Sequence, residues 1–244
     1  ADLGVKISFW RVLLNLVTGD EKGREELNKP LALALDDDDN LCITDYGAGA
    51  VYFYDRFTKR CKRWRQGGGL EFTSPVAIAK KKDVIYVADS SPGRVVAFDT
   101  EGRMKFHITN ELRRPAGLAV FGNRLAVADS QLHRILVYML NGQFLYMFGE
   151  RGEEDGGLNY PTHITSDNHG MLYVTDSMNY RIQVFTDTGL FVGKIGSAGE
   201  TSGHFSRPKG IAVDRWMNVY VADAIFDNVQ IFDTKGRFLL NFGA

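Results

Sequence analysis

The chain has 244 residues, of which 44% are hydrophobic and 24% are charged. A chain of this length can bury a sizeable core, as one domain or as two. The formal net charge of -1, with both signs interspersed, excludes the strong overall field of a dedicated nucleic-acid or anionic-membrane binder.

Residues 1–26 are predicted to form a separate N-terminal segment with a short helix. In the stretch "SFWRVLLNLVTG", Phe9, Leu13 and Leu16 share one helical face, Ser8 can cap its beginning and Gly19 can end it. The alternative interpretation is an outer strand of an incomplete blade. The apolar run in this stretch is too short to span a bilayer, and no cleavage-site pattern accompanies it.

From residue 27 onward, one unit is repeated five times. Each unit opens with a proline and carries an aspartate 14 or 15 residues later. The prolines are Pro30, Pro75, Pro115, Pro161 and Pro208, and the aspartates are Asp45, Asp89, Asp129, Asp176 and Asp223. The units are predicted to cover about 27–70, 71–110, 111–157, 158–204 and 205–244, in a single domain over 27–244.

Each unit is predicted to contain four antiparallel strands. The second unit shows the pattern: an alternating strand "VAIA", a β-rich strand "VIYVA" that ends at the aspartate, a third strand "RVVAF", and a tight hairpin into a fourth strand. Glycines that supply a positive φ are expected in four of these outer hairpins, at Gly102, Gly142, Gly189 and Gly236. The first unit has Thr58 in this place, so a longer or irregular hairpin is expected there.

Four antiparallel strands in each unit of 40 to 47 residues predict the blades of a β-propeller, an all-β fold. An apolar residue stands three positions before every leading proline and is expected to fill the space between blades. These residues are Leu27, Phe72, Leu112, Leu158 and Phe205. No second domain is expected.

Several other side chains are assigned to the scaffold. The repeated aspartates are expected to accept hydrogen bonds from the backbone N–H two residues on, in Asx-type turns. Arg94, Arg134 and Arg181 share one repeat position and are expected to form ion pairs with these aspartates. Cys42 and Cys61 lie on strands too far apart for a disulfide, so two free thiols are expected, with Cys42 buried.

The stretches "PTHITSDNHGMLYVTDSMNYRIQVF" and "PKGIAVDRWMNVYVADAIFDNVQIF" resemble the NHL repeat family of β-propellers, and the resemblance covers about residues 27–244. The resemblance implies a six-bladed ring, and the present sequence contains the repeats for five blades. We therefore expect the parent polypeptide to continue past Ala244; closure by five blades, self-association or another partner in the gap are the alternatives. Bacterial relatives of this type are often exported, which implies an extracytoplasmic, periplasmic location.

In a propeller, the loops before the first strands and after the second strands lie on one face around the axial channel, the default binding face. A mixed rim with aromatic residues suits a protein or peptide partner. The candidate partner-binding residues are Tyr46, Leu132, His163, Tyr180, Phe226, Arg114, Arg207 and Lys209. We predict a non-catalytic binding scaffold with no catalytic residue and no cofactor.

Two other functions are implied by the resemblance. Some six-bladed relatives are metal-dependent lyases or hydrolases, and His133, His163 and His204 are the candidate ligands here. Zinc needs three or four ligands, but only His163 stands two positions after a leading proline, and His133 and His204 lie in variable loops without an acidic partner nearby in sequence. Other relatives bind RNA on the same face, but the acidic run at 153–155 weakens that alternative.

Two charged stretches are assigned to the surface. The "DDDDN" stretch at 36–40 is interpreted as a solvated turn rather than a calcium site, attracted to the "KKKD" turn at 80–83. The basic stretch "KRCKRWRQ" at 59–66 is interpreted as protection of a sheet edge rather than a membrane or nucleic-acid patch.

Overall fold

The computed structural model of the chain describes residues 27–36 and 38–243. The predicted N-terminal helix lies outside these residues. Within them, no helix has the length and hydropathy that crossing a bilayer requires.

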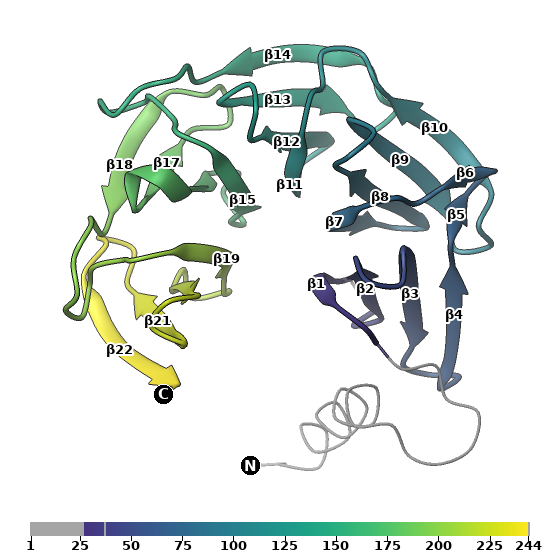
Figure 1. The fold of residues 1–244 in the computed structure, drawn as a ribbon, viewed down its shortest axis with the longest axis horizontal. Helices are drawn as coiled ribbons and strands as arrows, with labels where there is room; N and C mark the ends of the chain where they lie inside the picture. Colours follow the sequence, from purple (N-terminus) through teal and green to yellow (C-terminus); the bar gives the residue numbers. More distant parts are fainter. Residues whose placement is uncertain (1–26, 37, 244) are drawn as a thin grey trace.

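Five four-stranded antiparallel sheets stand as blades around a common centre (Figure 1). Blade 1 contains β1 (Pro30–Leu35), β2 (Leu41–Asp45), β3 (Ala50–Asp55) and β4 (Arg60–Trp64). Blade 2 contains β7 (Pro75–Lys81), β8 (Val84–Asp89), β9 (Arg94–Asp99) and β10 (Met104–Ile108). Blade 3 contains β11 (Pro115–Phe121), β12 (Arg124–Asp129), β13 (Arg134–Met139) and β14 (Phe144–Phe148).

Blade 4 contains β15 (Pro161–Ser166), β16 (Leu172–Asp176), β17 (Arg181–Phe185) and β18 (Phe191–Ile195). Blade 5 contains β19 (Pro208–Val213), β20 (Val219–Asp223), β21 (Asn228–Phe232) and β22 (Phe238–Gly243). A small pair, β5 (Gln66–Gly67) and β6 (Leu70–Glu71), lies between blades 1 and 2, and the 3-10 turn η1 (Ser177–Asn179) follows β16. The predicted all-β propeller with four antiparallel strands per blade is confirmed.

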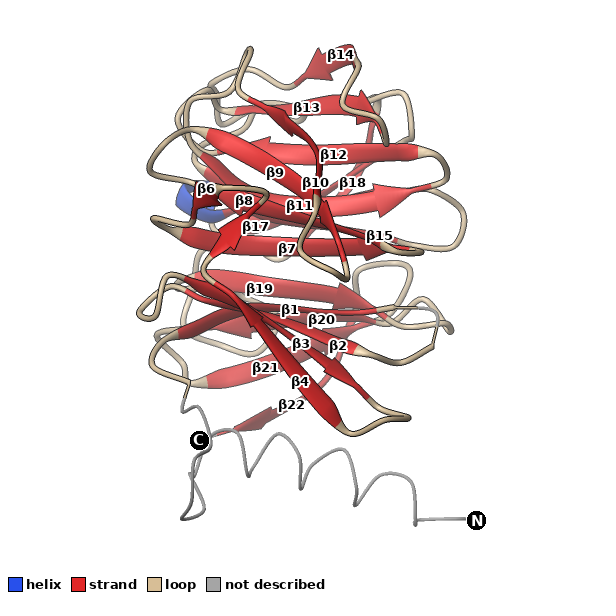
Figure 2. Ribbon diagram, turned by 90° about the vertical axis from the view of Figure 1, so that its right-hand side faces the viewer, coloured by secondary structure: helices blue, strands red, loops and turns tan. Residues whose placement is uncertain are grey.

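The first strand of each blade lies innermost and the fourth outermost, and the first strands of consecutive blades contact one another. The strands run between two faces formed by loops (Figure 2). The described part of the chain leaves the ring open between blade 1 and blade 5 (Figure 1).

In every blade, the leading proline pairs directly with the repeated aspartate across the first hairpin. The register shifts immediately after each proline, because a residue without an N–H cannot continue the hydrogen-bond ladder. The spacing of 14 or 15 residues in the sequence therefore corresponds to one fixed pairing in space.

The apolar residues before the prolines are buried between blades, as predicted. Phe72 packs with residues of blades 1 and 2, Leu112 with blades 2 and 3, Leu158 with blades 3 and 4, and Phe205 with blades 4 and 5. Leu27 is only partly buried, and it packs on blade 1 alone.

Burial of a repeat position depends on whether a neighbouring blade covers it. Leu33 is 59% exposed, although the equivalent residues Ile78, Leu118 and Ile164 in blades 2 to 4 are only 5% to 7% exposed. At the other end of the ring, Phe242 is 55% exposed and its equivalent in blade 4, Ile195, is 4% exposed. Blades 1 and 5 therefore each present an uncovered apolar face.

The hairpins that follow the third strands correct one prediction. Glycines with φ between 74° and 89° occupy four of them, as expected. The hairpin of blade 1 is not irregular: Asp55 pairs with Arg60 without a register shift, whereas the outer hairpins of the other blades each contain one. Lys59 takes the left-handed conformation with φ 58°, and the Asp55 carboxylate accepts the N–H groups of Phe57 and Thr58.

The junction of blades 1 and 2 contains a buried ion pair. Lys80 Nζ lies 2.5 Å from Asp36 Oδ2, and both side chains are buried. The predicted attraction between the two turns is therefore present, but the interpretation of Asp36 as a solvated residue is wrong. Burial alone would raise the pKa of Asp36, but hydrogen bonds from Lys80 and Asn40 lower it overall.

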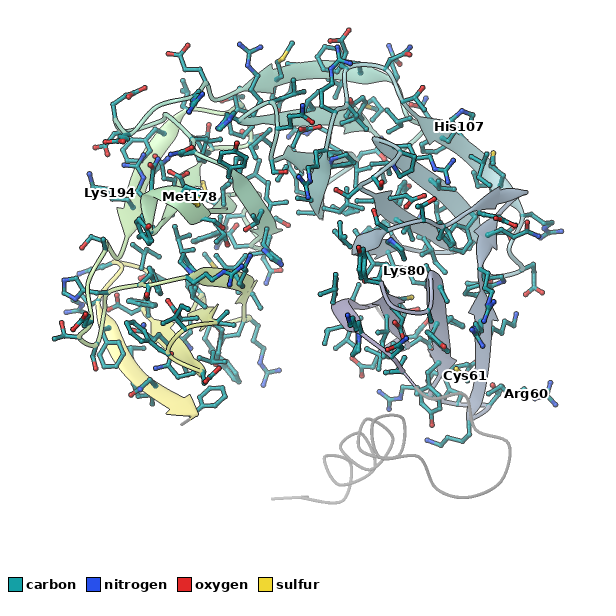
Figure 3. The ribbon with its side chains drawn as sticks, in the orientation of Figure 1. Arg60, Cys61, Lys80, His107, Met178 and Lys194 are labelled. Atoms are coloured by element: carbon teal, nitrogen blue, oxygen red, sulfur yellow. The ribbon has the colours of Figure 1, made fainter. Side chains whose placement is uncertain are left out.

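Part of the basic stretch also lies at this junction. Lys62 on β4 pairs with Glu101 of blade 2 at 2.8 Å, and Trp64 packs edge-to-face on Phe98. Cys42 is buried there, whereas Cys61, on the outer strand β4 (Figure 3), is exposed, and both are free thiols as predicted. Burial raises the pKa of the Cys42 thiol to about 12.

We expect replacement of Leu118 by Ala to destabilise the fold by about 2–5 kcal/mol, because the side chain is buried between blades 2 and 3. Leu33→Ala is the matched control at the same repeat position, and its cost should stay within about 0.5 kcal/mol because Leu33 is exposed. Urea unfolding of both variants measures the difference. Equal losses of stability would contradict the dependence of each blade on its neighbour.

Candidate functional site

The repeated aspartates hold together the face on which the candidate residues lie. Each carboxylate accepts backbone N–H groups from the segment that leads into its own blade: one at Asp176 and two at each of the other four aspartates. In blade 3, for example, Asp129 Oδ2 accepts the N–H groups of Arg113 and Arg114 at 2.7 and 2.8 Å. The carboxylate thus joins the segment before the proline to the loop between the second and third strands.

The predicted Asx-type bond from two residues on is less general. It occurs at Asp129, from Gln131, and at Asp223, from Ile225. For Asp45, Asp89 and Asp176 no bond of this kind is formed within the described residues. The bonds to the segment before the proline were missed by sequence reasoning, because their donors are 15 to 17 positions away.

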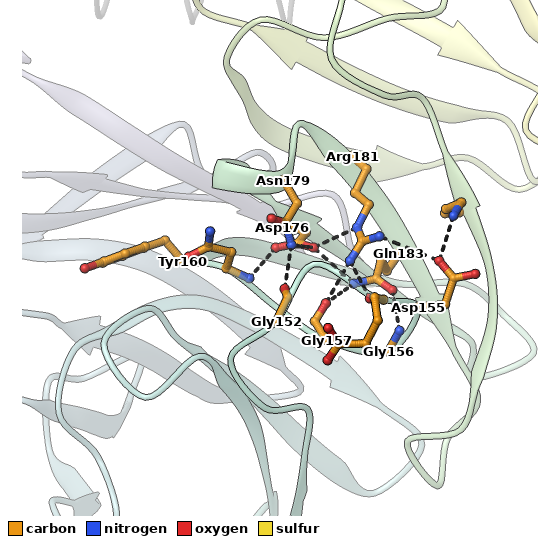
Figure 4. A network of polar contacts seen from close by, with 12 residues as sticks. Gly152, Asp155, Gly156, Gly157, Tyr160, Asp176, Asn179, Arg181 and Gln183 are labelled. Atoms are coloured by element: carbon orange, nitrogen blue, oxygen red, sulfur yellow. Dashed lines mark hydrogen bonds and ion pairs between the residues drawn. The ribbon is translucent and has the colours of Figure 1, made fainter.

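Two of the three predicted arginine–aspartate pairs are present. Arg94 Nη2 lies 2.7 Å from Asp89 Oδ2, and Arg181 Nε lies 2.9 Å from Asp176 Oδ2. Figure 4 shows that Arg181 and Gln183 also donate to the carbonyl of Gly157, which fastens the connecting loop to blade 4. The prediction for Arg134 is wrong: its guanidinium points to Met147 Sδ at 3.1 Å.

The candidate residues in the loops lie on one face of the propeller but differ in solvent exposure. Tyr46 and Tyr180 are solvent-exposed, and Tyr180 has a left-handed φ of 54°. Leu132 and Phe226 are only partly exposed, and Leu132 packs against the core of blades 2 and 3. Arg114 and Arg207 are exposed.

Three exposed apolar residues of this face were missed. Met178 and Ile225 are 52% and 57% exposed and occupy the same repeat position, two residues after the aspartate. Tyr160, 46% exposed, precedes the leading proline of blade 4. Alignment of this position across the five repeats would have shown that only blades 4 and 5 carry a large apolar residue there, since blades 1 to 3 have Gly47, Ser91 and Gln131.

His163 and Lys209 lie on the inner strands β15 and β19. His163 occupies a position that holds Ala77, Gly117 or Gly210 in other blades, and a Cβ added to Gly117 would lie 2.9 Å from His163 Cα. Burial, reinforced by the charge of Lys209, lowers the pKa of His163 to about 4. Burial lowers the pKa of Lys209 as well.

The three histidines considered as metal ligands have separate roles. His133 is buried, its Nδ1 accepts the N–H of Tyr160 at 3.2 Å, and the two rings stack edge-to-face across blades 3 and 4. His204 Nδ1 lies 3.0 Å from the hydroxyl of Thr201. Residues 27–36 and 38–243 contain no group of three or more His, Cys, Asp or Glu side chains that could hold a metal ion.

A cavity of about 460 Å³ opens on the same face, beside blade 3. It is lined by Thr109, Glu111, Leu112, Arg113, Leu132, Arg134 and Met147. Of these residues, Leu132 is among the partner-binding candidates predicted from the sequence.

Comparisons with known proteins agree with this architecture. The DUF5128 family, described as a 6-bladed beta-propeller, matches residues 153–239. Protein brain tumor of Drosophila melanogaster is 34% identical over 114 residues, which are 42% of this chain and 10% of that protein. The chain therefore matches about a tenth of the length of this curated relative.

Three solved structures have the same fold. A streptogramin B lyase has a TM-score of 0.70 at 15% identity, covering 88% of this chain and 68% of the lyase. Virginiamycin B lyase from Staphylococcus aureus, with quinupristin, also has a TM-score of 0.70 at 15% identity, covering 92% and 73%. A chain of a nidogen/laminin complex has a TM-score of 0.68 at 18% identity, covering 88% and 80%. At these identities the likeness shows the fold alone.

The low pKa of His163 predicts an acid-dependent loss of stability. An unfolded histidine titrates near pH 6.5. Between about pH 6.5 and 4 the unfolded chain therefore binds a proton that the folded protein does not, and folding loses up to about 3 kcal/mol as the pH falls. Above pH 6.5 this loss is absent.

His163→Gln should make the free energy of unfolding decline less steeply over this range, because glutamine does not titrate. Urea unfolding of wild type and variant at pH 7, 6, 5 and 4.5 measures the two slopes. Parallel curves would show that His163 is readily protonated in the folded protein.

Proposed function

We propose that this chain is an NHL-type propeller that acts as a non-catalytic scaffold, recognising a protein or peptide partner on the loop face. The observation that carries this proposal is the set of exposed apolar side chains on rigid turns of that face. Its most exposed members are Tyr46, Tyr160, Met178 and Ile225. Large exposed apolar and aromatic side chains on one face are typical of surfaces that bind proteins.

The turns that carry these side chains are firmly held. Tyr46 and Ile225 follow Asp45 and Asp223 closely, and the N–H of Ile225 donates to the Asp223 carboxylate at 2.9 Å. The N–H of Met178 donates to the carbonyl of Asn159 at 3.1 Å, which joins η1 to the segment beside Tyr160. A rigid surface loses little conformational entropy on binding, which favours affinity.

The charge of this face also suits a peptide. Arg114 and Arg207 are exposed in loops of the same face, and Lys209, which is partly buried, lies on the inner strand β19. The acidic segment 153–155 lies in the loop that leads into blade 4, where Asp155 pairs with Lys194 at 2.7 Å. Charges of both signs among exposed apolar side chains support a protein partner. RNA, with its uniformly negative phosphate backbone, would favour a uniformly basic surface.

The domain boundaries and the number of blades belong to the same proposal. We place residues 27–244 in one propeller domain of the six-bladed type. The exposed apolar faces of blades 1 and 5 support a further blade-like unit between them, because every other blade face of this kind is covered. An extracytoplasmic location is part of the proposal through the resemblance to exported bacterial relatives.

We expect the double variant Tyr46→Ala with Tyr180→Ala to retain its partner at least tenfold less well, because exposed aromatic anchors contribute most to such interfaces. The measurement is quantitative mass spectrometry of proteins retained from host-cell extract by immobilised wild type and variant, followed by titration of the retained protein against both.

The matched control is Phe57→Ala with Leu190→Ala, which removes two apolar side chains that are even more exposed than Tyr46 and Tyr180 from hairpins of the opposite face. This control should retain the partner as wild type does, and all proteins should keep their unfolding temperature. Equal retention by the Tyr46 and Tyr180 variant, or equal loss in the control, would contradict the assignment of the loop face.

A further inference from the structure

The segments that connect consecutive blades differ in length. Blades 3 and 4 are joined by residues 149–160, and blades 4 and 5 by residues 196–207. The connection from blade 1 to blade 2 spans 65–74 and folds into the β5–β6 pair. Blades 2 and 3 are joined by only six residues, 109–114, which contain no strand.

Two of the longer connections, those into blades 2 and 4, are bound to the following blade by a repeated arginine. In blade 2, Arg94 donates through Nη2 to the carbonyl of Glu71 on β6. In blade 4, Arg181 Nη2 donates to the carbonyls of Glu154 and Gly157 at 2.7 and 2.9 Å. In both blades the arginine therefore fastens the connection to the repeated aspartate.

Arg134 has the same place in blade 3 but forms neither bond. The Asp129 carboxylate is already occupied by four backbone donors: the N–H groups of Arg113 and Arg114 on Oδ2, and those of Gln131 and Leu132 on Oδ1. In blade 2 the residue equivalent to Leu132 is Pro92, which has no N–H, so Asp89 keeps an oxygen for Arg94.

The short connection leaves the guanidinium of Arg134 facing the cavity. Its hydrogen bond within the described residues goes to Met147 Sδ, a weak acceptor. Arg113 lines the same cavity, and neither arginine forms an ion pair within the described residues. Leu112, Leu132 and Met147 form the apolar part of the wall, and Glu111 adds one negative charge at the exposed connection.

We infer that this cavity binds an aspartate or glutamate side chain of a partner peptide, together with an adjacent apolar residue. The inference rests on the proposed function and names the chemistry that one part of the loop face recognises. Guanidinium groups bind carboxylates through paired, charge-assisted hydrogen bonds. Two arginines and one glutamate leave a net charge of +1 in the lining, which matches one carboxylate better than a doubly charged phosphate. The volume lies within the usual range for ligand pockets.

The test is an NMR titration of the full chain with the capped peptide acetyl-Leu-Asp-Leu-amide, with acetyl-Leu-Asn-Leu-amide as its uncharged counterpart. We expect saturable shifts of the backbone amides of residues 109–113 and 131–134 with the aspartate peptide. Binding should weaken at least tenfold with the asparagine peptide and in the Arg134→Gln variant, and it should decrease as salt is added.

Arg181→Gln is the matched control, because it removes the same repeated arginine where a connection covers it. It should lower the unfolding temperature and leave the peptide affinity unchanged, whereas Arg134→Gln should weaken binding at least tenfold and keep the unfolding temperature. Absence of shifts, undiminished affinity in Arg134→Gln, or an equal fall in unfolding temperature for both variants would overturn the inference. The retention experiment tests the loop face through Tyr46 and Tyr180, whereas the peptide titration tests the cavity through Arg134. A failure of the proposed function can therefore be distinguished from a failure of the cavity proposal.

Discussion

The rest of the structure depends on one hydrogen-bonding arrangement: a buried carboxylate at the end of each second strand binds the N–H groups that precede the leading proline. The five aspartates are 0% to 2% exposed. A buried carboxylate is costly unless it is hydrogen-bonded, so the aspartate and the incoming segment require one another. At Asp223, burial alone would raise the pKa, but four backbone N–H groups lower it overall. The loop face thus repeats one arrangement five times, in which an aspartate carboxylate accepts backbone N–H from the segment before the leading proline.

Apolar burial between blades complements this polar arrangement. A single four-stranded sheet has two apolar faces, and each residue of the repeat becomes core only where the adjacent blade covers it. Leu33 and Leu118 occupy the same repeat position, and so do Phe242 and Ile195. In each pair the first residue has no covering blade and is exposed, whereas the second is covered and buried. Stability is therefore shared along the ring, while the turns that carry Tyr46 and Ile225 are held by bonds within their own blade.

Period, strand number and the Pro–Asp register could be predicted because they depend on local alternation and on residues that recur in the sequence. One error concerns a contact between distant segments, and another concerns the conformation of a local turn. Asp36 looks like a solvated turn residue until Lys80 of the next blade is placed against it. Thr58 suggested an irregular hairpin because the glycine was missing, yet Lys59 adopts the required φ and the Asp55 carboxylate stabilises the turn. The candidate site was predicted only as a face, since exposure of Met178 and Ile225 depends on packing that one repeat does not show.

A repeat fold acquires a specific site where one copy departs from the others. Arg94 and Arg181 are bound by an aspartate and by a connecting segment, so their charges are satisfied internally. Arg134 has the same position, but the N–H of Leu132, which stands where blade 2 has Pro92, donates to the Asp129 carboxylate, and the connection is shorter. Arg134 therefore lacks the carboxylate and the loop carbonyl that Arg94 binds in blade 2. A charge that the scaffold leaves without an internal anion, next to an apolar wall, remains available for an anion from outside. The same physical requirement that makes the arginine structural in two blades therefore makes it a binding group in the third.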